Sequence, residues 1–156
     1  MPAAPFPFTS GQILTAAQMN AIGAYTAYTP ALTATVTNPT LGTGGSQIGF
    51  YTTINNLCIG YGAVLFGGSG ANAGVGLYRI SLPLPGTGSE YSVGAGRIRD
   101  ASSGFLAYVC EFGFAGNTTQ MNIQYGSGVA FSVGATVPFT FDNNDQIFFQ
   151  FQYRLP

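Results

Sequence analysis

Few residues of this chain could carry out chemistry. Its 156 residues include five acidic side chains, four arginines, no lysine and no histidine. The lack of histidine excludes Ser-His-Asp and Cys-His nucleophiles and His-bearing zinc sites, and the lack of lysine excludes a Schiff base. Glycoside hydrolysis by two carboxylates remains as a reaction class, and its candidate residues are Glu90, Asp100, Glu111, Asp142 and Asp145.

Glu111 is the unusual acid, because it alternates with Phe105, Ala107 and Val109 in an apolar segment. A carboxyl group in such a place can have a raised pKa and act as a general acid. In the alternative interpretation, it lies on an exposed or subunit-facing side and pairs with an arginine. We favour the second interpretation and predict that the protein is not an enzyme and has no catalytic residue.

Two loops superficially resemble ligand sites. Residues 68–74 are rich in glycine, but the segment that follows is typical of a strand and not of the helix that binds pyrophosphate. Residues 142–145 offer oxygen ligands but lack the glycine and the later glutamate of a calcium loop. We therefore predict a hairpin loop and a turn, with no cofactor and no metal.

The low charge content predicts an assembly. About 6% of the residues are charged, against roughly 25% in ordinary soluble domains. A surface so poor in charge is expected to be covered by other protein. Four arginines are too few to neutralise a nucleic-acid backbone, and there is no long apolar run, so we expect neither a nucleic-acid nor a membrane partner.

Cys58 and Cys110 fall in separate segments with strand character. They could pair across a sheet, but two buried free thiols in a reducing compartment are the favoured interpretation.

Residues 1–26 differ from the rest and are expected to form an extended arm and one short helix. Thr15 and Gln18 have the spacing of a capping box, and Gly23 follows as the glycine expected to end the helix in the left-handed conformation. Two helical turns are not stable alone, so the helix needs a partner, which is either the chain's own domain or another subunit. We favour the other subunit. The predicted anchoring residues are Phe6, Phe8, Ile13, Leu14, Met19 and Ile22.

Residues 27–156 are expected to form one all-β domain. Alternation of apolar and polar residues recurs, with turn-rich clusters between the alternating segments. Eight or nine short strands of this kind fit an antiparallel β-sandwich or jelly roll. The predicted strands cover residues 28–37, 47–54, 57–66, 75–82, 91–99, 105–114, 120–125, 129–133 and 146–155.

The beginning of the chain has a distinctive motif. Residues 11–20 fit the pattern G-Q-x-L-T-A-A-x-M-N, and residues 28–32 fit Y-T-P-x-L. With shorter matches at residues 47–49, 80–83, 144–147 and 153–154, the chain resembles tailed-bacteriophage virion structural proteins. The resemblance implies a β-sandwich of jelly-roll type, labelled in that family a minor tail or appendage protein and often trimeric.

Two functions are therefore expected. The first is a capsid decoration or appendage protein, made in the cytoplasm of the host bacterium and carried on the virion. It would be a homotrimer held by its N-terminal segment to the major capsid protein or to tail proteins. The alternative is a tail tip or fibre protein for host attachment, whose aromatic residues stack on a host-surface glycan. The candidate glycan contacts are Phe66, Tyr78 and Tyr91.

Overall fold

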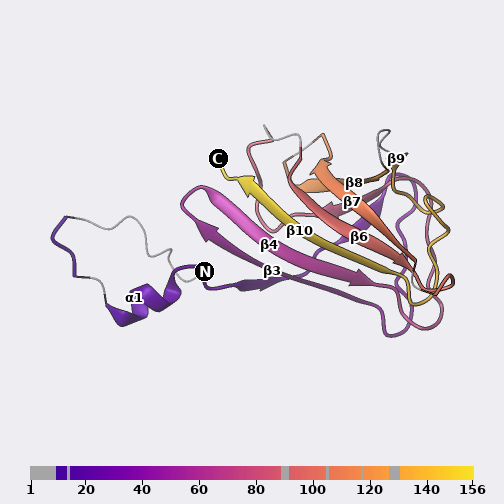
Figure 1. The fold of residues 1–156 in the computed structure, drawn as a ribbon, viewed down its shortest axis with the longest axis horizontal. Coiled ribbons are helices and arrows are strands. Elements are labelled where there is room, and N and C mark those ends of the chain that lie inside the picture. The colour runs from indigo at the N-terminus through magenta and orange to yellow at the C-terminus, as the bar shows by residue number, and fades with distance from the viewer. Residues whose placement is uncertain (1–9, 14, 89–91, 105, 117, 127–130) are drawn as a thin grey trace.

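The computed structural model describes residues 10–13, 15–88, 92–104, 106–116, 118–126 and 131–156. In this part of the chain there is one helix, α1 (Ala16–Ala21), and the rest is built from short strands (Figure 1). The strands are β1 (Thr26–Tyr28), β2 (Leu32–Ala34), β3 (Ser46–Ile54), β4 (Leu57–Leu65), β5 (Tyr78–Ser81), β6 (Gly94–Asp100), β7 (Leu106–Phe114), β8 (Gln120–Tyr125), β9 (Phe131–Ser132) and β10 (Gln146–Arg154). The predicted all-β class, with one short N-terminal helix, is confirmed.

The strands form one continuous antiparallel sheet in the order β1-β3-β4-β10-β6-β7-β8-β5-β2, and β9 pairs with β8. Its two edge strands, β1 and β2, are consecutive in the chain and separated only by residues 29–31. A link of that length spans about 14 Å at most. The sheet must therefore curl until its edges approach, as a half-barrel does, in place of the two separate layers of the predicted sandwich.

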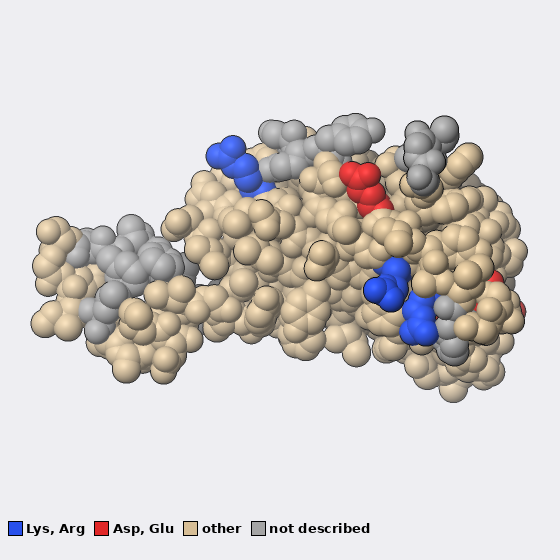
Figure 2. Space-filling model, in the orientation of Figure 1, with Lys and Arg blue, Asp and Glu red and all other residues tan. Residues whose placement is uncertain are grey.

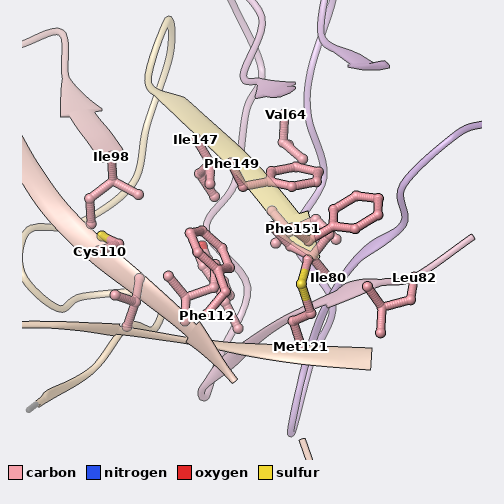
Figure 3. Packing of buried hydrophobic residues seen from close by; sticks show 14 of the residues in the cluster. Val64, Ile80, Leu82, Ile98, Cys110, Phe112, Met121, Ile147, Phe149 and Phe151 are labelled. Atoms are coloured by element: carbon pink, nitrogen blue, oxygen red, sulfur yellow. The ribbon is translucent and has the colours of Figure 1, made fainter. Parts of the chain in front are cut away.

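The curled sheet encloses the core on its inner face. Figure 3 shows side chains from β4 and β10 gathered in one cluster with side chains from β5, β6, β7 and β8. The last strand has the alternation that its sequence predicts. Ile147, Phe149, Phe151 and Tyr153 are buried, whereas Gln150, Gln152 and Arg154 are exposed.

Glycines on β4 make room for aromatic rings. Gly60 and Gly62 lie opposite Phe151 and Phe149 of β10, and a Cβ atom at either glycine would overlap the facing ring. A glycine inside a strand can also permit the close approach of another backbone. The carbonyl oxygen of Phe50 does lie close to Gly60, but the rings are the main occupants of the space.

The first predicted strand, residues 28–37, is wrong as one strand. Pro30 has no N–H to donate, and the chain there crosses from one edge of the sheet to the other. The Gln47 side-chain amide, on β3, binds this crossing segment: it donates to the Pro30 carbonyl at 3.2 Å and accepts from the Leu32 N–H at 3.1 Å. Beyond β2, Val36 is 72% exposed although its alternation with Leu32 predicts a shared face.

The predicted helix ends are confirmed. The Thr15 N–H donates to the Gln18 side chain at 2.9 Å, and the Gln18 N–H donates to the Thr15 hydroxyl at 3.2 Å, which completes the capping box. Gly23 has a φ of 75°, which is the expected left-handed conformation. The expected packing of Leu14 on Met19 lies outside the described residues.

Candidate functional site: the N-terminal helix and the outer face of the sheet

The helix α1 has well-formed ends but packs little against the described part of the chain. None of its residues is buried, and Figure 1 shows it standing apart from the sheet. Three of the predicted anchoring residues are open to solvent: Ile13 is 87% exposed, Met19 53% and Ile22 37%. Phe6, Phe8 and Leu14 lie outside the described residues. Of the two predicted partners, the chain's own domain is therefore not the one that covers this helix.

The outer face of the sheet is unexpectedly apolar. On β4, side chains alternate between the core and the outside, yet neither set contains a charged residue and the outward set is almost entirely apolar. The strand register aligns Ile48, Ala63, Phe148, Arg97 and Val109 in one row across five strands. Val109 is 79% exposed. This face was not predicted from the sequence, although apolar residues on both sides of a strand were the available signal.

Charged residues are sparse on this face. Figure 2 shows a few charged side chains, some of the basic ones next to each other, with broad uncharged surface around them. The next row of side chains places Glu111 opposite Ala95 on β6 and Gln124 on β8. Arg97 and Glu111 are both exposed and are diagonal neighbours on adjacent strands, a relation that places Cβ atoms about 7–8 Å apart. They form no ion pair with each other in the described part of the chain.

A hollow of about 690 Å³ opens beside Glu111. Ser92, Glu111 and Gln124 supply polar groups to it, and Ala95, Ala107 and Val109 supply apolar surface. Among the described residues that line it, Glu111 is the single carboxylate. The described residues of this hollow do not supply the pair of facing carboxyl groups that glycoside hydrolysis needs, and Glu90 lies outside the described residues. A second hollow of about 390 Å³ adjoins it around Tyr61, Arg97 and Phe148.

The aromatic residues predicted to stack on sugars lie elsewhere. Phe66 and Tyr78 are 3% and 1% exposed, and both rings pack on Phe141 in the core. The Tyr78 hydroxyl donates to the Ala73 carbonyl at 2.7 Å. Neither ring offers a face to a ligand, so sugar stacking does not fit their positions. Tyr91 lies outside the described residues.

The acidic residues at one end of the sheet bind backbone groups. The Asp145 carboxylate accepts from the N–H groups of Ala101 at 2.8 Å and Asp142 at 2.6 Å, which closes the turn predicted over residues 142–145. Burial raises the pKa of Asp145. Asp100 accepts from the Ser102 hydroxyl at 2.7 Å and from the N–H groups of Ser102 and Ser103, and these hydrogen bonds lower its pKa. No cluster of three metal-ligating side chains occurs within the described ranges.

Both cysteines are buried and unpaired, as predicted. Burial raises the pKa of both thiols, that of Cys110 to about 11.

The comparisons with known proteins add no relative: no family model, curated protein or solved structure matches the chain. Where the chain is described, it has no helix that is long and apolar enough to span a membrane.

Proposed function

We propose that the protein is a structural component of a tailed-bacteriophage virion, a decoration or appendage protein that is fixed to the particle by its N-terminal segment. The observation that carries this proposal is the helix α1, which has a complete capping box and exposed apolar side chains but buries none of its residues. A helix this short requires packing from outside to stay formed. The motif in residues 11–20 points to the same class of protein.

The sheet domain supports the second part of the proposal, self-association into a homotrimer. Its charge content is too low to keep copies apart, and its outer face exposes Ile48, Tyr61 and Val109. The major capsid protein or a tail protein is the proposed partner of the N-terminal segment. Chemistry has no part in this proposal, and neither does a cofactor.

The test is attachment of variants to particles that lack the protein. Met19 and Ile22 are three residues apart and share one side of α1, whereas Ala17 lies on the opposite side. We expect Met19→Glu combined with Ile22→Glu to abolish attachment, because the change puts charge into an apolar contact. Ala17→Glu adds charge to the same helix and should attach normally. Equal attachment of both variants would show that α1 is not the anchor.

The hollow beside Glu111 favours a second candidate, a host-attachment protein that binds a glycan. Ser92, Glu111 and Gln124 can hydrogen bond to sugar hydroxyls above an apolar floor. A glycan array with the purified protein separates the two functions. Binding that Gln124→Ala and Glu111→Gln abolish supports the glycan-binding protein, and an array without signal supports the purely structural one.

A further inference from the structure

The outer face of the sheet carries a self-complementary pattern of charge. Arg97 on β6 and Glu111 on β7 are diagonal neighbours. Arg97 stands between Val109 and Phe148 on the neighbouring strands, and Glu111 stands between Ala95 and Gln124. Arg99, the next outward side chain on β6, donates to the Gln146 side chain at 3.1 Å. About a three-fold axis, the arginine of each copy can face the glutamate of the next, so that every copy supplies one arginine and one glutamate to its two neighbours.

We infer that this face, made by the outward side chains of β3, β4, β10, β6 and β7, binds a second copy of the chain, with Arg97 of one copy paired to Glu111 of the next. The inference rests on the self-association that forms part of the proposed function, and it names the surface. The occupant follows from the charges. Arg97 and Glu111 form no ion pair within the described part of the chain, and the same two residues on another copy can match them.

The apolar part of the face supplies the contact area. Ile48 is 49% exposed, Tyr61 48% and Val109 79%. They lie in two adjacent rows that cross β3, β4, β10, β6 and β7, and five strands spaced about 4.8 Å apart make a face roughly 19 Å across. Apolar side chains at the centre with charges that fix the register are the usual composition of an interface between subunits.

The first experiment measures the mass of the full chain by sedimentation across a concentration series. Val109→Asp places charge at the most exposed apolar side chain named on this face. Val36→Asp is the matched control, because Val36 is 72% exposed but lies outside this face. We expect the wild type and Val36→Asp to associate and Val109→Asp to be monomeric, with the same circular dichroism spectrum for all three. A wild type that stays monomeric, or a Val109→Asp variant that associates as the wild type does, would overturn the inference.

The second experiment exchanges the charges. Arg97→Glu and Glu111→Arg should each raise the dissociation constant about tenfold or more, and the double variant should recover most of that loss. No recovery in the double variant would overturn the pairing. Particle attachment, measured on the same proteins, separates this inference from the proposed function: a monomer that still attaches to particles leaves the virion role intact and removes only the self-association face.

Discussion

The glycines of β4 allow the packing of the core to be tested by the addition of a single methyl group. We predict that Gly60→Ala destabilises the domain, because the new Cβ would overlap the ring of Phe151 and crowd the Phe50 carbonyl oxygen. Overpacking of this kind costs about 1–3 kcal/mol. In a domain of this length, 1 kcal/mol shifts the Tm by roughly 2–4 °C. The expected fall is therefore about 2–12 °C, measured by thermal unfolding.

Gly68→Ala is the matched control. Gly68 has no positive φ, and a Cβ there would meet only the Asn144 side chain at 3.6 Å. The control variant should be as stable as the wild type or slightly more stable, since alanine restricts the unfolded chain. In the Gly60→Ala background, Phe151→Leu should cost less than it does alone, because it removes the overlapping ring atoms. A Gly60→Ala protein that melts at or above the wild-type temperature would refute the proposed packing.

Three further predictions follow from the termini, the thiols and the acids. Thr15→Ala should leave the Tm of the domain unchanged, since α1 buries no residue, but should weaken the helix by about 1 kcal/mol and so lower the occupancy on particles, measured by quantitative gel analysis. Cys58 and Cys110 should not react with a thiol reagent at pH 8 until the protein unfolds, because both are buried and a pKa of about 11 leaves about one Cys110 thiol in a thousand ionised; rapid labelling of the native protein would contradict this. The pKa of Asp100 is lower in the folded protein than in the unfolded chain. Its carboxylate therefore stabilises the fold at pH values above the unfolded-state pKa, and this contribution is lost as the pH falls through the folded-state pKa. Asp100→Asn should therefore lower the Tm at pH 7, and the difference from the wild type should shrink below about pH 4 in thermal melts; a difference independent of pH would contradict the assignment.

Local patterns were enough to predict some elements. The capping box of α1 depends on Thr15 and Gln18 alone, three residues apart. The alternation in β10 predicts both the strand and the separation of its faces, because every second residue from Ile147 to Tyr153 is large and apolar.

Other features depend on residues far apart in the chain. The chain crosses between the two edges of the sheet at Pro30 because the sheet curls until β1 and β2 approach. No short segment of the sequence encodes this curl. Alternation shows that residues share a face but not which face is inside, so Phe66 and Tyr78 could be mistaken for exposed rings. The pairing of Arg97 with Val109, and of Glu111 with Ala95, required the register of β6 on β7.

The most direct test of the proposed virion role is electron cryomicroscopy of purified bacteriophage particles that were assembled in the presence of this chain. The account predicts a β-sheet domain on the particle surface, with the density of α1 seated in a neighbouring virion protein and its Met19 side covered. Purified particles that lack the chain, or particles in which α1 stands uncovered while another surface makes the attachment, would contradict it.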